Sequence, residues 1–287
     1  EIGSGLVGSE MCIRDRWILS KMNDLVQEVT DNMEKFELGI AVSKLYDFLW
    51  EEFCDWYIEM VKPRLWDDAD ETKAAALWTL KTVLTTGLKL LHPYMPFVTE
   101  EIFCTLTDEE SIMISKWPEY DKAFDFKADE AAVDKIKEAV RGIRNVRTEM
   151  NVAPSRKASV YVVSPKEDIR AIFTASKNFF AMLGYANEVH VQADKSGIAD
   201  DAVSVVIHDA AIYIPFAELV DIEKEIERLT KEQTKLEAEI KRASGMLANP
   251  KFVDKAPAAK VEEERAKLQK YTETLEQVKE RLANIAK

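Results

Sequence analysis

Apolar residues recur at steps of three and four along much of the chain, and this spacing constrains the fold more than any other feature. It begins at Asp15 and continues to about Val146. Each stripe of such residues lies on one face of a helix, and these faces are stable only when they are buried against one another. The stripes begin at Ile18, Leu38, Leu77 and Ile136 and end at Phe36, Met60, Leu91 and Val146. They predict a mainly α fold with a helical bundle over residues 14–154, with Pro63 among the prolines that end its helices.

Residues 218–287 follow a heptad pattern in two runs, which the Pro-containing segment 249–259 separates. Two runs of similar length joined by a short loop favour an antiparallel coiled coil that closes on itself. The heptad core is mixed, because it includes Gln233, Ala243 and Tyr271. Such a core argues against a strong parallel dimer, so we expect a monomer with a coiled-coil arm.

Between residues 155 and 217 the period changes to that of strands. Four short segments are rich in β-branched residues and are bounded by Pro, Asp or Gly. The segments are Ala158–Val163, Glu188–Val191, Val203–Ile207 and Ala211–Ile214. Helical spacing over Lys166–Leu183 places a crossover helix between the first two. This part of the chain predicts a small α+β subdomain.

Residues 1–13 fit none of these patterns. Their three glycines spell GxGxxG, the phosphate-binding fingerprint of dinucleotide sites. However, no strand precedes this segment and no βαβ unit follows it, and the fingerprint requires both. We therefore expect a disordered or artefactual leader with no cofactor site.

The charge of the chain limits its partners. With 39 Lys and Arg against 52 Asp and Glu, the net charge is −13. Proteins that bind nucleic acid by broad electrostatics are usually basic, so the charge argues against a DNA partner and leaves only local basic patches. No apolar run approaches the roughly 18 residues of a membrane span, so no membrane partner is expected.

Cysteine and histidine provide no recognisable site. Cys12, Cys54 and Cys104 are isolated from one another, which argues against disulfides and structural zinc and favours a cytoplasmic setting. Cys54 and Cys104 lie among large apolar residues and are expected in the core. The three histidines lack partners at ligand or triad spacing, and the sequence contains no HExxH, GxSxG or P-loop motif. We expect no catalytic, cofactor-binding or metal-binding residues.

Five basic residues gather within a 17-residue stretch: Arg141, Arg144, Arg147, Arg156 and Lys157. The three-residue steps between the first three place them on one helical face. Like charges repel there unless an anion lies opposite, and guanidinium binds phosphate in a bidentate manner. The alternative is that these arginines pair with acidic residues of the bundle, and the spacing alone leaves both open.

Several segments together resemble the region that follows the catalytic domain in the valine–tRNA ligase family of class I aminoacyl-tRNA synthetases. These segments are DRWILSKMN (15–23), FCDWYIEMVKPRLW (53–66), LLHPYMPFVTEEIF (90–103), ISKWP (114–118) and IRNVRTEMNVAPSRK (143–157). The small α+β part and the hairpin with its NPKFVDKAP loop follow in the family's order. The last segment and the hairpin favour the valine ligase family over the isoleucine and leucine ligases. The isoleucine enzyme is expected to end with cysteine-bound zinc, and this chain has no such cysteines.

The resemblance implies a tRNA-binding C-terminal portion of such a ligase. The HIGH-like and KMSKS-like signatures of the ATP site are absent from the sequence, and so is the editing domain. ATP and Mg²⁺ would therefore belong to the missing catalytic domain, and this portion alone would be inactive. Its partners would be valine tRNA and the missing catalytic and editing domains of the same enzyme.

By the same resemblance, the bundle would bind the anticodon stem-loop and the arm would reach the outer corner of the tRNA. Unpaired anticodon bases can stack on aromatic rings and be read along their edges. The candidate tRNA contacts are Arg16, Trp17, Arg141, Arg144, Arg147, Arg156 and Lys157 in the body, and Lys224, Arg228, Lys231 and Lys235 on the arm. For the arm, the open alternative is a solvated face of ion pairs such as Glu227–Lys231.

Two other functions remain open from the sequence. One is a helical and coiled-coil interaction protein without an RNA role. The other is the equivalent region of an isoleucine or leucine tRNA ligase, which a change of tRNA would distinguish.

Overall fold

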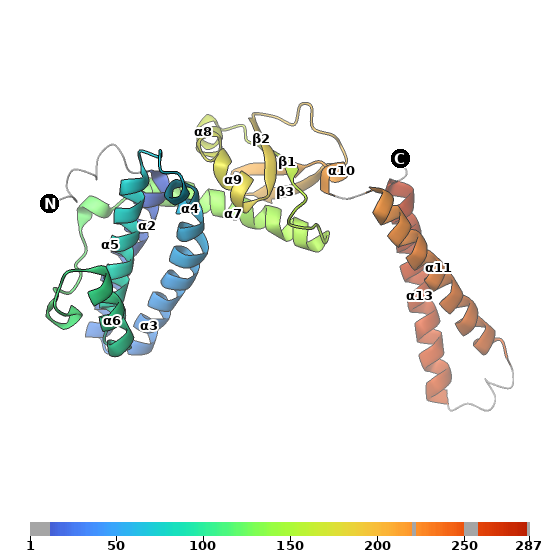
Figure 1. The fold of residues 1–287 in the computed structure, drawn as a ribbon. Helices are drawn as coiled ribbons and strands as arrows, with labels where there is room; N and C mark the ends of the chain where they lie inside the picture. The colour runs from blue at the N-terminus through green and yellow to red at the C-terminus, as the bar shows by residue number, and fades with distance from the viewer. Residues whose placement is uncertain (1–11, 220–221, 250–257, 286–287) are drawn as a thin grey trace.

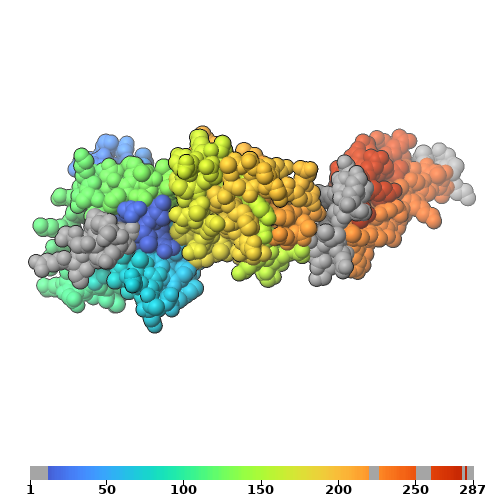
Figure 2. All heavy atoms as spheres, turned by 90° about the horizontal axis from the view of Figure 1, so that it is seen from above, coloured from blue at the N-terminus to red at the C-terminus, as the bar shows by residue number. Residues whose placement is uncertain are grey.

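A computed structural model describes residues 12–219, 222–249 and 258–285 (Figure 1). The fold class is confirmed, because helices dominate and a small sheet accompanies them. Most of the predicted leader lies outside the described residues, but Cys12 caps the first described helix and Ile13 begins it. The bundle, the sheet and the helical arm follow one another along an elongated molecule (Figures 1 and 2). None of the described helices is both long and apolar enough to cross a membrane.

The bundle is built around helix α2, which packs against α3, α5 and α7. Its helices are α2 (Ile13–Glu34), α3 (Leu38–Asp47), η1 (Phe48–Ile58), α4 (Glu59–Trp66), α5 (Lys73–Leu91), α6 (Pro96–Leu106) and α7 (Lys127–Glu149), with the short turns η2 (Ile112–Ile114) and η3 (Lys122–Phe124). Segments α3, η1 and α4 form one continuous helical path, in which η1 is a wider π-type helix. Pro63 lies within α4, so the expectation that it ends a helix is wrong.

The predicted stripes supply most of the core but are wrong at their ends. Leu45, Met60 and Ile136 are fully buried. Phe36, by contrast, is 87% exposed, because α2 ends at Glu34 and Phe36 adopts a positive φ of 59° beyond it. Leu38 and Leu77 are also exposed near the starts of their helices.

The predicted burial of Cys54 is wrong. Its side chain is exposed, and Cys104 is partly exposed. Cys54 follows the buried Phe53 directly, and successive side chains of a helix point in different directions, so an apolar neighbourhood in sequence does not place it on the buried face.

The sheet contains the four predicted strands in the order β2-β1-β4-β3. The strands are β1 (Ala158–Val163), β2 (Ala186–Gln192), β3 (Val203–Ile207) and β4 (Ala210–Ile214). Strand β1 pairs in parallel with β2 and antiparallel with β4. The predicted crossover helix is divided at Ser176 into α8 (Glu167–Ala175) and α9 (Lys177–Leu183).

Helix α7 belongs to both the bundle and the sheet, because it packs on α2 and on β3. Gly142 makes the second contact possible. A Cβ at this position would lie only 2.4 Å from Cγ1 of Val205 on β3. The absent side chain therefore lets the sheet lie directly against the helix and sets how the two parts meet.

The arm consists of α11 (Ile222–Leu247) and α13 (Ala258–Ile285), which pack along each other and are preceded by α10 (Phe216–Leu219). Residues of both heptad runs face inward, and Leu229, Ala243, Val261 and Val278 are buried. Most of the predicted loop 249–259 lies outside the described residues. Figure 1 shows the two helices as a limb at the opposite end of the molecule from the bundle.

Candidate nucleic-acid interface

Arg141 and Arg144 place their guanidinium groups against one tryptophan. Their Cζ atoms lie 5.4 and 5.5 Å from the ring centroid of Trp56. Nε of Arg144 also donates a hydrogen bond of 2.8 Å to the carbonyl of Leu183. Within the described part of the chain, neither arginine forms an ion pair with an acidic residue. The alternative that these two arginines pair with bundle acids therefore finds no support in their geometry.

Arg147 does not share the face of Arg141. Its side chain is buried and donates hydrogen bonds to the carbonyls of Ala153 and Arg156, at 3.0 and 2.5 Å. Burial lowers the pKa of its guanidinium. Six residues turn an α-helix by about 240° beyond a full turn, so Arg141 and Arg147 are about 120° apart around α7. The guanidinium of Arg147 holds the segment after α7, and its contact with tRNA stays a prediction that this placement does not favour.

A groove of about 640 Å³ opens beside Arg141 and Arg144, where the bundle meets the sheet. Its bundle wall carries aromatic and acidic side chains. Trp50 on this wall is 58% exposed and stacks parallel to Tyr46, with ring centroids 6.3 Å apart. The lining residues are Trp50, Glu51, Asp55, Trp56, Glu59, Arg141, Arg144, Met182, Leu183 and Tyr185.

The aromatic part of this groove was not predicted from the sequence. Trp50 directly follows Leu49, an apolar residue that lies between the ends of the predicted stripe at Leu38 and Met60. A helical-wheel argument could have identified it, because Tyr46 and Trp50 are four residues apart and lie off the buried stripe.

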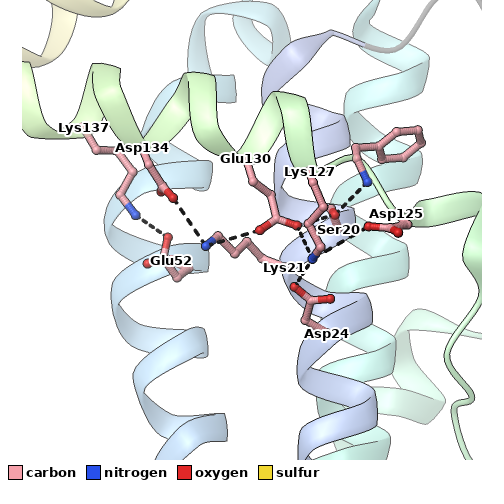
Figure 3. A network of polar contacts seen from close by, with 10 residues as sticks. Ser20, Lys21, Asp24, Glu52, Asp125, Lys127, Glu130, Asp134 and Lys137 are labelled. Carbon is pink, nitrogen blue, oxygen red and sulfur yellow. Dashed lines mark hydrogen bonds and ion pairs between the residues drawn. The ribbon is translucent and has the colours of Figure 1, made fainter. Parts of the chain in front are cut away.

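A network of charged side chains fixes α7 against α2 and η1 (Figure 3). The hydroxyl of Ser20 donates to the carboxylate of Glu130, and Nζ of Lys21 lies 3.5 Å from the same carboxylate. Lys137 pairs with Glu52, and its Nζ lies 5.0 Å from the ring centroid of Trp17. Burial lowers the pKa of Lys137.

Arg16 and Trp17 lie near the start of α2. Arg16 pairs with an acidic residue of the protein, and Trp17 lies in the protein interior. Arg16 forms two hydrogen bonds with Asp129, at 2.8 and 2.9 Å, and the hydrogen bonding raises its pKa. Trp17 is fully buried, so its ring has no face for an external base. Their predicted tRNA contacts stay predictions, and the geometry offers Trp17 no route to one.

Arg156 and Lys157 are adjacent but differ in their surroundings. Arg156 donates from Nε to the carbonyl of Glu218, at 2.6 Å, and from a terminal nitrogen to the carbonyl of Ala217, at 3.2 Å. These carbonyls belong to α10, which leads into the arm. Lys157 is exposed, and no hydrogen bond or ion pair of its side chain exists among the described residues.

The predicted basic residues of the arm are divided in the same way. Arg228 pairs with Glu232 at 3.1 Å, and Lys231 pairs with Glu227. Lys235 is exposed and forms no ion pair with any described residue. The side chain of Lys224 lies outside the described residues. Two of the predicted basic residues, Arg228 and Lys231, thus form ion pairs within the arm, as the alternative expected. Lys235 forms none with a described residue.

Two families match separate parts of the chain. Residues 15–162 match the anticodon-binding domain of tRNA ligase, and residues 221–286 match the valyl tRNA synthetase tRNA binding arm. Among the described residues, no group of three or more metal-binding side chains is present.

Whole-protein relatives point in the same direction. Over 275 residues the chain is 50% identical to valine–tRNA ligase from Clostridium acetobutylicum, which is 96% of this chain and 31% of that protein. It is 50% identical to valine–tRNA ligase from Clostridium perfringens over 274 residues and 37% identical to that from Enterococcus faecalis over 277 residues. These matches cover 95% and 96% of this chain. The chain spans about a third of the length of these relatives, with 31% of each covered.

Proposed function

Because the chain belongs to the family of tRNA-ligase anticodon-binding domains, we propose that it binds valine tRNA as the tRNA-binding portion of a valine–tRNA ligase. One observation carries this proposal. The anticodon-binding match and the valyl-type arm match occur in succession on one chain. An interaction protein without an RNA role would have no reason to combine them.

The two matched parts would divide the work. The bundle would bind the anticodon stem-loop, whose unpaired bases are accessible to side chains. The arm would contact the outer corner of the tRNA, far from the site of aminoacylation. Binding energy from such remote contacts can be used to stabilise the transition state at the reacting centre. We expect the protein to bind tRNA in the cytoplasm and as a monomer.

The whole ligase would join valine to its tRNA with ATP and Mg²⁺. The HIGH-like and KMSKS-like signatures that serve this step are absent from the sequence. We therefore expect no aminoacylation when this chain alone is mixed with valine, ATP, Mg²⁺ and tRNA. Measurable turnover would contradict this expectation.

Among the predicted contacts, we favour three with exposed cationic groups and no ion pair to a described residue: Arg141, Lys157 and Lys235. Arg144 joins them because it lines the same groove as Arg141. Such groups can meet phosphate or base edges without first breaking an internal ion pair, which lowers the cost of binding.

A titration with two transcripts tests the proposal. The first is a valine tRNA transcript, and the second is the same transcript with a changed anticodon. Tighter binding of the first supports anticodon recognition, and equal binding leaves a module that reads only shape or phosphate. Absence of binding to either at low salt contradicts the proposal. An isoleucine tRNA that binds more tightly than the valine tRNA would instead favour the equivalent region of another ligase.

A further inference from the structure

The groove between the bundle and the sheet holds charged groups of both signs that do not pair with each other. Arg141 lies on one wall, and Glu51 and Asp55 lie on the other. Both carboxylates are exposed, and neither forms a hydrogen bond or an ion pair with any described side chain. The third acid, Glu59, is already paired with Lys62. Two carboxylates and a guanidinium therefore line one groove, and none of the three forms a hydrogen bond or an ion pair with a described residue.

This mixture argues against a phosphate in the groove. A phosphate would gain from the guanidinium groups of Arg141 and Arg144, but Glu51 and Asp55 would repel it at the same site. A neutral ligand that carries hydrogen-bond donors on one edge and acceptors on another avoids this conflict. Nucleobases have this property, and RNA presents them unpaired in its loops.

Guanine is the base that matches both walls. Its Watson–Crick edge carries two adjacent donors, N1–H and the 2-amino group, which fit the two oxygens of a carboxylate. Its adjoining Hoogsteen edge carries O6 and N7, the acceptor pair that guanidinium contacts in a bidentate manner. Adenine, cytosine and uracil lack the pair of adjacent donors that a carboxylate can bind in this way.

Trp50 completes the site. Trp50 lines the groove, is more than half exposed, and lies parallel to the ring of Tyr46. An accessible aromatic ring beside hydrogen-bonding groups is the usual arrangement by which proteins hold a splayed base. We propose that this groove binds one unpaired guanine of the tRNA, with Trp50 stacking on the base, Glu51 or Asp55 accepting from its donor edge, and Arg141 donating to O6 and N7.

This proposal rests on the proposed tRNA-binding function. Neutralising the two carboxylates should change the affinity for tRNA in opposite directions for a bound guanine and a bound phosphate. Glu51→Gln and Asp55→Asn each remove a negative charge from an exposed side chain, so both variants should fold. If the groove binds guanine, the affinity of the double variant for valine tRNA should fall by about 5- to 150-fold, the range of one bidentate base contact. If the groove binds phosphate, loss of the two charges should strengthen binding.

The matched control is Glu138→Gln. Glu138 is an exposed acid on α7, the helix that carries Arg141, and it does not line the groove. Its affinity for tRNA should match that of the unmodified chain. A second readout is the dependence of affinity on salt. Arg141→Ala should weaken binding with an unchanged salt slope if Arg141 contacts a base, whereas loss of a phosphate contact reduces the slope by about one unit.

Short RNAs test the identity of the base. The probes are the single-stranded tetranucleotides UUGU, UUAU and UUUU, and UUGU with inosine in place of guanosine. Quenching of Trp50 fluorescence, assigned by its loss in Trp50→Phe, should report tightest binding for UUGU. Inosine lacks the 2-amino group and should bind about tenfold more weakly, since one charge-assisted hydrogen bond is lost.

The outcomes are distinguishable. If the unmodified chain binds tRNA but the Glu51→Gln and Asp55→Asn variants bind as tightly or more tightly, the guanine site is wrong and tRNA binding stands. Equal binding of UUGU, its inosine form and UUAU also overturns the guanine site. If the unmodified chain binds no tRNA, both the proposed function and the site that rests on it fail.

Discussion

The guanidinium of Arg64 donates to both carboxylate oxygens of Asp15, at 2.8 and 2.9 Å, and both side chains are buried. Asp15 lies in the first turn of α2 and Arg64 in α4. The hydroxyl of Tyr57 donates to the same carboxylate at 2.8 Å, and Nε of Arg64 donates to Oγ1 of Thr72. One ion pair thus joins the start of α2, the path through η1 and α4, and the residue before α5.

We expect Asp15→Ala to lower the free energy of unfolding by about 3–5 kcal/mol, because it leaves the buried guanidinium of Arg64 without its counter-ion. Denaturant unfolding followed by far-UV circular dichroism measures the loss. The control is Glu28→Gln, which removes an exposed ion pair with Lys44 and should change stability by less than about 1 kcal/mol. Equal effects of the two substitutions would show that the buried pair has no special role.

The sequence could not predict this pair. Asp15 and Arg64 are 49 residues apart, and apolar spacing identifies which helical faces are buried without showing which charged residues accompany them. Both residues fall in segments that carry the family resemblance, but resemblance alone does not distinguish a buried ion pair from a contact with tRNA. The predicted strands succeeded for the opposite reason, since β-branched runs bounded by turn residues are a local signal.

Gly142→Ala should destabilise the protein by about 1–3 kcal/mol. The new methyl group would lie 2.4 Å from Cγ1 of Val205, a β-branched side chain with little freedom to rotate away. In an open helical site the same change stabilises by up to about 1 kcal/mol, because alanine has the higher helix propensity. Gly39→Ala in α3 is that control, since nothing lies within 4 Å of its new Cβ.

Thermal and denaturant unfolding of both glycine variants measures the change in unfolding free energy, which should be a loss for Gly142→Ala and a gain for Gly39→Ala. The double variant Gly142→Ala, Val205→Ala should recover part of the loss, because it removes the atom that the new methyl group meets. If Gly142→Ala alone is as stable as the unmodified chain, the sheet can shift away from α7, and the close contact does not fix how the two parts meet.

Asp209 should make the sheet sensitive to acid. It lies between β3 and β4, and hydrogen bonds from Lys135 on α7 and from Lys166 lower the pKa of its carboxyl from 3.8 to about 2. A carboxyl whose pKa is lower in the folded state stabilises the fold above its unfolded pKa, and this stabilisation is lost as the pH falls towards 2. The unmodified chain should therefore exceed Asp209→Asn in stability at pH 7, and the difference should shrink between pH 4 and pH 2. A difference that stays constant over this range would contradict the ion pairs as its source.

The arginines of α7 show a limit of pattern reasoning about sites. Equal spacing placed Arg141, Arg144 and Arg147 on one predicted face. However, each three-residue step falls about 60° short of a full helical turn, so two steps separate Arg141 from Arg147 by about 120°. The structure therefore buries Arg147 and leaves Arg141 exposed. The groove beside Arg141 depends on α9 and η1, which come from distant parts of the sequence, so local spacing could not reveal it.

Arg156→Ala and Lys157→Ala should weaken tRNA binding in different ways. Arg156 binds the carbonyls of α10 at the root of the arm, so its loss should reduce affinity by misplacing the arm and leave the salt slope unchanged. Lys157 is exposed, and a phosphate contact there would make its loss reduce the salt slope by about one unit. Binding isotherms at several salt concentrations separate the two. A reduced slope for Arg156→Ala would assign Arg156 to the tRNA interface instead.

Lys235→Ala should weaken tRNA binding and reduce the salt slope by about one unit if the arm contacts phosphates. Lys235 is exposed and has no described ion pair, whereas Lys231 is held by Glu227. Glu227→Gln should therefore strengthen binding, because it frees Lys231 and removes a repulsive charge from the same side of α11. The control is Lys241→Ala, which removes an exposed lysine about 120° around the helix from Lys235 and should leave affinity unchanged. Equal affinities for all three variants would assign this face of the arm to solvent.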